Sequence, residues 1–321
     1  MGLLLSFRVC QAFGDCPLHF YLDFLDLLGY YYMIDYLWLY IHADKGRNFN
    51  NMKIGSTLFD IGSRTFIVGI LNVTPDSFFD GGIYITTEQA VIRAKKLVDE
   101  GADIIEIGGE SSRPGYTPVE ACVEIDRVLP VLKELTKTIN VPISIDTCKS
   151  AVAEAALQNG ASLINDISCF KQDPELAKVC AKHNAVCCVM HNRDNMNYNN
   201  FLLDVIDDLK DSVNSLVQAG VSHDNIIIDP GIGFAKTVSH NLEVMRNLSL
   251  FASLPYPIMV GTSRKSFIGR TLNLPVEERL EATIATTALA VSQYCDFIRV
   301  HDVQENKRAA VISDEIIRRR H

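Results

Sequence analysis

The feature that most constrains the fold is an alternation, from residue 52 onward, of short apolar runs with longer amphipathic segments. Several of the runs are rich in β-branched residues, which is typical of buried parallel strands. The runs cover residues 66–71, 104–107, 142–145, 162–164, 185–190, 225–228, 258–260 and 297–300. Eight strands alternating with helices predict an α/β protein with a single (β/α)8 TIM barrel. An open doubly wound sheet is the alternative, without a GxGxxG loop to support it.

Two of the amphipathic segments carry helix-start signals. Thr86 and Gln89 have the spacing of a capping box, and Gly101 predicts the end of that helix. In the next segment, Thr117 is predicted as the N-cap and Pro118 as the first helical residue.

The first 51 residues differ from the rest and are treated as an N-terminal extension to a domain spanning 52–321. They are rich in Leu, Tyr and Phe, but aspartates interrupt every apolar stretch, so no membrane span is expected. We expect Met52 to be the native start, because residues 45–47 can be encoded by a sequence resembling a ribosome-binding site. The extension is then a mis-assigned start or a poorly ordered segment, and an arm covering a hydrophobic patch is the alternative.

The net charge limits which partners the protein can bind, and the cysteine spacing indicates its cellular compartment. A net charge of -9 argues against sequence-independent binding to nucleic acid, which needs clustered Lys and Arg. The nine cysteines show no CxxC or secreted-scaffold spacing. Reduced thiols in a cytoplasmic protein are therefore expected.

All eight predicted strands end in polar residues, at the rim where barrels of this kind carry their sites. A single polar strand end is usually a helix cap. Asp146, Asn165 and Asp229, however, end three different strands. Two carboxylates and an amide can accept the N–H groups of a flat, nitrogen-rich ring. Metal binding by the same acids is the competing reading, with His191 as the nearby imidazole.

Positive side chains are expected on the other side of the same rim. Lys265, Arg299 and His301, with Arg264 close by, gather in a chain of net negative charge. They predict a local anion pocket for phosphate or diphosphate, separate from the acids.

Seven motifs, in this order, resemble those of the dihydropteroate synthase family: GILNVTPDSF, IIEIGGESSRPG, SIDT, NDIS, DPGIGF, GTSRKSFIG and RVHD. The resemblance covers residues 52–321. It implies condensation of 6-hydroxymethyl-7,8-dihydropterin diphosphate with 4-aminobenzoate, giving 7,8-dihydropteroate and diphosphate in folate biosynthesis. It further implies Mg²⁺ as cofactor, a homodimer and an enzyme of the kind that sulfonamides target.

The resemblance assigns roles to residues matching the family motifs. Asn72 resembles the ligand of a Mg²⁺ ion that bridges the diphosphate, and Asn72, Lys265, Arg299 and His301 are the expected catalytic residues. The implied pterin pocket comprises Asp146, Asn165, Met190, Asp229 and Lys265. Asn72, Arg299 and His301 are expected to bind the diphosphate. The expected aminobenzoate contacts are Phe78, Ser112, Arg113, Pro114, Phe234 and Ser266.

Small departures from the family and two alternative functions stay open at this point. Ser112 stands where Thr is common, Phe79 where a small polar residue is usual, and Glu106 where Asp is common. A methyltetrahydrofolate methyltransferase shares the barrel and the acid-lined pterin site, but the SRKSF and ESSRPG loops tell against it. A non-catalytic pterin-binding paralogue is expected to lose Asn72, Arg113 or the diphosphate cations, and all remain.

Overall fold

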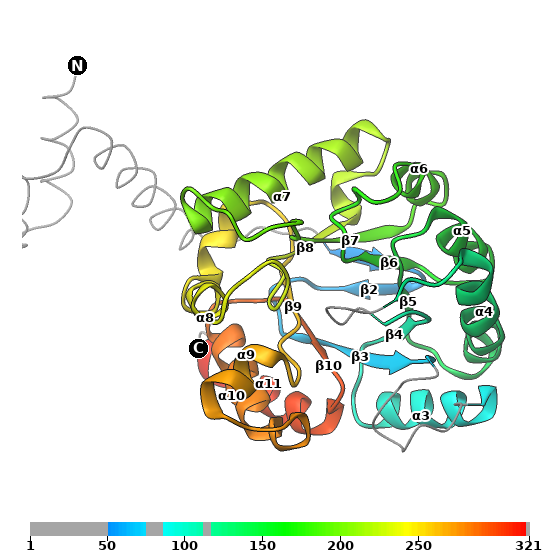
Figure 1. The fold of residues 1–321 in the computed structure, drawn as a ribbon. Helices are drawn as coiled ribbons and strands as arrows, with labels where there is room; N and C mark the ends of the chain where they lie inside the picture. Colours follow the sequence, from blue (N-terminus) through cyan, green and yellow to red (C-terminus); the bar gives the residue numbers. More distant parts are fainter. Residues whose placement is uncertain (1–50, 75–85, 112–116, 319–321) are drawn as a thin grey trace, which may run out of the picture. The chain divides into compact units, whose positions relative to one another are not determined.

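The computed structural model describes residues 51–74, 86–111 and 117–318. Among these residues, eight parallel strands form one sheet in the order β8-β7-β6-β5-β4-β3-β10-β9, and Figure 1 shows the helices packed around it. The strands are β3 (Phe66–Asn72), β4 (Ile104–Gly108), β5 (Ile143–Asp146), β6 (Leu163–Asp166), β7 (Val186–Met190), β8 (Ile226–Asp229), β9 (Met259–Val260) and β10 (Phe297–Val300). The predicted barrel is confirmed, with each strand within a residue or two of its apolar run.

The sheet closes where β8 meets β9. A single parallel bridge joins Ile228 to Ile258. The Ile228 N–H also donates to the carbonyl of Pro257 at 2.9 Å. The other neighbouring strands pair over two to five residues each. The open doubly wound sheet is therefore excluded, and the β8–β9 joint is the thinnest of the barrel.

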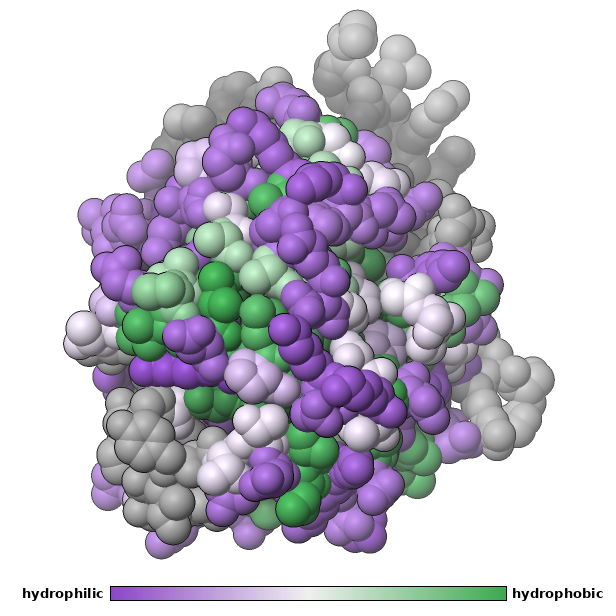
Figure 2. All heavy atoms as spheres, turned by 90° about the vertical axis from the view of Figure 1, so that its right-hand side faces the viewer, coloured by the Kyte–Doolittle hydropathy of each residue, from purple (hydrophilic) through white to green (hydrophobic). Residues whose placement is uncertain are grey.

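Helices follow the strands and cover the outside of the barrel. They are α3 (Thr87–Asp99), α4 (Ala121–Thr138), α5 (Ser150–Gln158), α6 (Glu175–Lys182), α7 (Phe201–Gln218), α8 (Val238–Arg246), α9 (Ser266–Leu272), α10 (Leu280–Ser292) and α11 (Val303–Ile317). Their inward stripes are apolar and buried; in α3 they are Ala90, Ala94 and Leu97. Figure 2 shows the side that carries α4 to α6, which is covered mainly by hydrophilic residues. This pattern is what a one-sided helix on a barrel requires.

The two predicted helix starts have different outcomes. The capping box of Thr86 and Gln89 is present, and α3 ends just before Gly101. The second prediction is wrong, because α4 begins at Ala121 with Glu120 as its N-cap. The physical reason is a competing acceptor: the N–H of Val119 donates to the Glu110 carboxylate at 2.6 Å, which holds this stretch extended before the helix.

The opposite end of the barrel is closed by an N-terminal hairpin of β1 (Met52–Ile54) and β2 (Thr57–Phe59). Its residues join a buried apolar cluster with the first residues of the barrel strands. The ring of Phe59 lies 4.9 Å from that of Phe66 and 6.0 Å from that of Phe297. The amino ends of the strands therefore pack against a hydrophobic plug.

Two further expectations bear on the described residues. None of the helices in the described ranges is long and apolar enough to cross a membrane. The seven cysteines between Cys122 and Cys295 form no disulfide bond with one another, and all but Cys122 are buried. The predictions for residues 1–51 lie outside the described residues, apart from Asn51, and stay predictions.

Candidate active site

The residues predicted for the pterin pocket lie together at the carboxyl rim of the barrel. Asp146, Met190 and Asp229 are the last residues of β5, β7 and β8, and Asn165 is one residue short of the end of β6. The strand register sets Asp146 beside Asn165, and Met190 beside Asp229. All four side chains are at least nine-tenths buried. The rim thus holds two carboxylates, an amide and a thioether on four adjacent strands.

Arg299, near the end of β10, lies between two of the buried acids. Its Nε donates to Glu106 at 2.5 Å and its Nη2 donates to Asp146 at 2.8 Å. Burial raises the pKa of Asp146 to about 7; the Arg299 charge opposes this rise and the Glu106 charge adds to it. This arrangement departs from the expected separation of acids and cations, because here the cation bonds directly to a pterin-site acid.

Glu106 is the functional candidate that the sequence analysis treated only as a departure from the family. It lies inside β4, is fully buried, and accepts from the Ser144 hydroxyl as well as from Arg299. A charged residue in an otherwise apolar strand that is buried on both faces was the available signal. A buried charge of this kind requires a partner, and the partner is Arg299.

Asp229 and Asn165 have acceptors that suit a ligand with N–H donors. One oxygen of Asp229 accepts the N–H of Gly231 at 2.7 Å. Burial raises the pKa of Asp229, and the charge of Lys265 opposes this rise. The Oδ1 of Asn165 is buried and accepts no hydrogen bond from the described residues. Because unpaired buried acceptors are rare, Asn165 fits a donor supplied by a bound molecule.

Lys265 lies just before α9 and interacts electrostatically with Asp229 and Asp146. Its amine donates to the carbonyl of Ile232 and lies 4.8 Å from the centre of the Phe234 ring. Burial lowers the pKa of Lys265 to about 8, and Asp229 is the main opposing charge. The lysine therefore links the pterin-site acid to the aromatic residue predicted for aminobenzoate.

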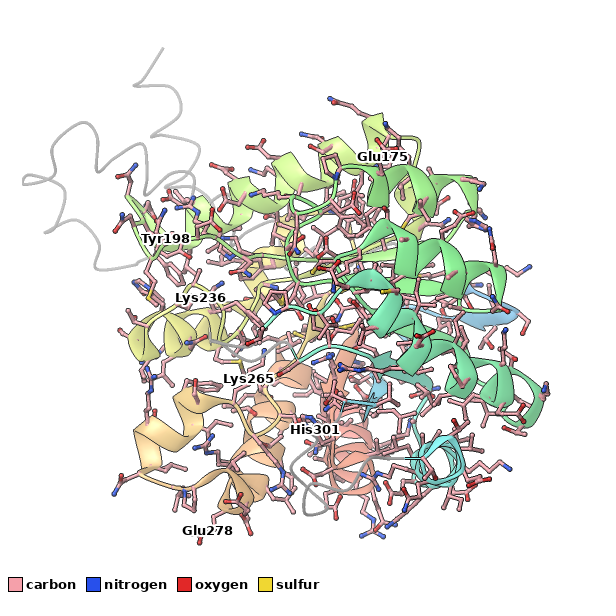
Figure 3. The ribbon with its side chains drawn as sticks, turned by 45° about the vertical axis from the view of Figure 1, so that its right-hand side comes forward. Glu175, Tyr198, Lys236, Lys265, Glu278 and His301 are labelled. Atoms are coloured by element: carbon pink, nitrogen blue, oxygen red, sulfur yellow. The ribbon has the colours of Figure 1, made fainter. Side chains whose placement is uncertain are left out.

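His301 and Ser266 complete the cation side. The His301 ring nitrogen Nδ1 lies 2.9 Å from the Ser263 hydroxyl, which also accepts the His301 backbone N–H. Ser266 is the exposed first residue of α9. Figure 3 shows Lys236, Lys265 and His301 in succession across the middle of the view. Of these, Lys236 was not predicted from the sequence.

Asn72, the residue predicted to bind a metal ion, lies at the end of β3. The side chain is half-buried, and it hydrogen-bonds to none of the described residues. In the described ranges no group of three or more His, Cys, Asp or Glu side chains could hold a metal. Mg²⁺ often keeps several waters and binds through one or two protein oxygens plus substrate phosphates. A lone Asn oxygen beside an anion pocket fits this mode, and it does not fit an all-protein metal cage.

Four predicted aminobenzoate contacts lie outside the described residues: Phe78, Ser112, Arg113 and Pro114. Their predicted role stays a prediction. Of the other two, Phe234 lies beside Lys265 and Ser266 begins α9.

Comparison with known proteins gives the same answer from two directions. Residues 68–301 match the family model of pterin-binding enzymes. A dihydropteroate synthase from Clostridium beijerinckii is 56% identical over 269 residues, which are 84% of this chain and 100% of the relative. The chain belongs to the dihydropteroate synthase family of pterin-binding enzymes. The resemblance read from the seven motifs is confirmed.

Solved structures of dihydropteroate synthases share the fold. The enzyme from Clostridium difficile, crystallised in the presence of pteroic acid, superposes with a TM-score of 0.79 at 47% identity, covering 81% of this chain and 100% of that one. The enzyme from Xanthomonas albilineans, solved with 4-aminobenzoic acid, has a TM-score of 0.79 at 33% identity, covering 83% of this chain and 97% of that one.

Proposed function

We propose that this protein is a dihydropteroate synthase that joins 6-hydroxymethyl-7,8-dihydropterin diphosphate to 4-aminobenzoate, releasing diphosphate. Family membership supports the reaction. The observation that carries the assignment to this rim is the buried pair of Asp229 and Asn165, whose acceptors suit the N–H edge of an aminopyrimidinone ring. A carboxylate can accept two parallel N–H bonds from such an edge, and charge-assisted bonds are roughly twice as strong as neutral ones.

The reaction breaks the C–O bond between the pterin methylene and the diphosphate. The bond electrons leave with the diphosphate, and the electron-rich dihydropterin shares the positive charge left on the methylene. The aniline nitrogen of 4-aminobenzoate then forms the new C–N bond and loses a proton. Because that nitrogen is already a nucleophile, no residue of the protein needs to form a covalent intermediate.

The chain's own residues hold and polarise the two substrates. Arg299 keeps its Nη1 group without a hydrogen bond to the described residues, so it can donate to the diphosphate while the other nitrogens stay on Glu106 and Asp146. His301 and Lys265 add donors where negative charge grows as the C–O bond breaks. On the other side, Phe234 offers an aromatic face to the aminobenzoate ring.

Mg²⁺ fits this proposal as a partner of the diphosphate. When bound, it supplies positive charge that stabilises the departing phosphate oxygens. Asn72 would hold it, through the side-chain oxygen. A homodimer in the cytoplasm is part of the same proposal, on the ground of the family resemblance alone. Light scattering on the purified protein gives the mass that checks the dimer.

One assay tests the function directly. The protein is incubated with the pterin diphosphate, labelled 4-aminobenzoate and Mg²⁺, and labelled dihydropteroate is separated by chromatography. Matched reactions omit the pterin diphosphate or use the Asp229→Ala variant, and both should give no product. Pterin binding without any labelled product would contradict the proposal and indicate a non-catalytic pterin-binding protein.

A further inference from the structure

Lys236 is a buried cation close to the turn that follows β8. It follows β8 by seven residues and is 6% exposed. Its amine donates to the carbonyl of Phe234 at 3.1 Å and bonds to the His191 ring nitrogen Nδ1 at 2.8 Å. Two of its three donors are therefore used inside the protein.

A row of charged and polar groups continues from this lysine to α7. The other ring nitrogen of His191, Nε2, lies 3.0 Å from the Asp208 carboxylate, which also accepts from Arg193 at 2.5 Å. Because an ammonium group only donates, Nδ1 of His191 must accept and Nε2 must carry the proton. Burial lowers the pKa of His191 to about 4, in agreement with a neutral ring.

The same lysine lies directly behind the turn that orients Asp229. Gly231 donates its N–H to Asp229 at 2.7 Å. A Cβ at Gly231 would lie 3.2 Å from the Lys236 amine and 1.9 Å from the carbonyl oxygen of His191. The glycine, with φ of 72°, is thus required by the close approach of these groups. Lys236 is therefore buried against the turn that follows Asp229.

We propose that Lys236 is a positioning residue for pterin: held by His191 and Phe234, it keeps positive charge behind the Asp229 turn and favours the ionised carboxylate that pterin binds. This inference rests on the proposed function for the identity of the ligand. Lys236 acts on pterin only through Asp229. His191 and Asp208 keep the amine in place and favour its charged form.

Titratable groups face Lys236 from several elements. Burial lowers the pKa of Lys236 to about 7; Asp229 at the end of β8, Cys169 after β6 and Asp208 on α7 oppose this change, and Lys265 adds to it. Lys236 is therefore charged below pH 7 and increasingly neutral above it. Its influence on Asp229 should be strongest on the acid side.

The test measures binding of 6-hydroxymethyl-7,8-dihydropterin by calorimetry between pH 6 and pH 8.5. Lys236→Met removes the charge and both hydrogen bonds but keeps most of the side-chain length. At pH 6 we expect the Kd to rise roughly threefold over wild type, the factor for about half a pKa unit at Asp229, because Lys265 and Arg299 favour its ionised form more than Lys236 does. The ratio of the two Kd values should fall toward one as the pH rises to 8.5, because wild-type Lys236 is then neutral.

The matched control is Lys307→Met, which also replaces a lysine by methionine. Lys307 is half-buried and pairs with Asp103 at 3.1 Å, away from the rim. Its Kd ratio to wild type should stay close to one at every pH. If Lys236→Met does not fold, Asp208→Asn is the second variant. It removes a charge that favours protonated Lys236, so it should lower the lysine pKa and give a smaller loss, largest just below pH 7 and absent both well below and well above that pH.

A Kd ratio for Lys236→Met that is the same at all pH values would overturn the proposal, since a purely structural defect weakens binding equally throughout. No loss at pH 6 would overturn it as well. These outcomes are separate from failure of the proposed function. That failure appears as a wild-type protein that binds pterin and forms no dihydropteroate, in which case the Kd ratios can still be measured.

Discussion

The two ends of the barrel are built from the same strands and have opposite chemistry. At the amino ends, Phe59, Phe66 and Phe297 pack with other apolar side chains under the β1–β2 hairpin. At the carboxyl ends, the buried Asp146 pairs with the half-buried Arg299 among other charged groups. Burying apolar groups stabilises the fold, whereas burying charges costs stability unless they are paired. We therefore expect the hairpin end of the barrel to determine the stability of the fold and the charged end to determine ligand binding.

The largest effect is expected at the charged end. Asp229→Ala should abolish measurable pterin binding, a loss of roughly 3 kcal/mol or more, because the ring loses a charged acceptor and its own donors are left unpaired. Titration calorimetry with 6-hydroxymethyl-7,8-dihydropterin measures the loss. Normal pterin affinity in this variant would refute the pocket assignment.

The next effect is a stability change at the hairpin end. Phe59→Ala should lower the free energy of unfolding by about 3–5 kcal/mol, since it leaves a cavity between the rings of Phe66 and Phe297. Urea denaturation measures it. The control is Leu58→Ala at the neighbouring residue, which is 62% exposed and should change stability by less than about 0.5 kcal/mol. A change in kcat/KM of the folded Phe59→Ala variant would contradict the claim that the hairpin end affects stability and leaves activity unchanged.

A smaller and more selective effect is expected for Asn72→Ala. Binding of inorganic diphosphate in the presence of Mg²⁺ should weaken by about tenfold, which is roughly the loss of one good hydrogen-bond or ligand contact. Binding of the pterin without diphosphate should change by less than about twofold, as a residue that touches only metal and diphosphate requires. Equal losses for both ligands would show that Asn72 contacts the pterin instead.

The smallest effect is a pH shift caused by Glu106→Gln. The Glu106 charge helps to raise the pKa of Asp146, so its removal should lower that pKa. Pterin binding that requires ionised Asp146 should weaken in wild type as the pH falls below about 7. In the variant, the same weakening should begin at a lower pH. Calorimetry between pH 5.5 and pH 8 checks this. A shift toward higher pH would mean that Glu106 acts mainly by holding Arg299 in place.

Much of the fold was predictable because its signals are local. Each strand is a compact apolar run, and the capping box of Thr86 and Gln89 depends on residues three apart. The start of α4 was mispredicted because the N–H of Val119 donates to Glu110 across a loop. The residue types at the predicted helix start, Thr117 among them, do not indicate that contact. The strand ends predicted which acids and cations share the rim.

The pairing within the rim was not predictable from these signals. Arg299 and Glu106 are 193 residues apart in sequence, and Lys236 and His191 are 45 apart. Both pairs depend on which side chains the closed barrel brings into contact. A charge such as Glu106 within a buried strand indicates that some partner exists, but the partner's identity requires the folded structure.

The thin joint between β8 and β9 has a consequence for the motions of the protein. One edge of β8 pairs with β7 over four residues, whereas the other edge is joined to the residue before β9 by the single Ile228–Ile258 bridge. Transient opening of the cylinder therefore needs the fewest broken bonds along this line. The β8 edge is therefore expected to open first. Because β8 ends in Asp229, the least stable strand pairing of the barrel lies next to the residue on which pterin recognition depends.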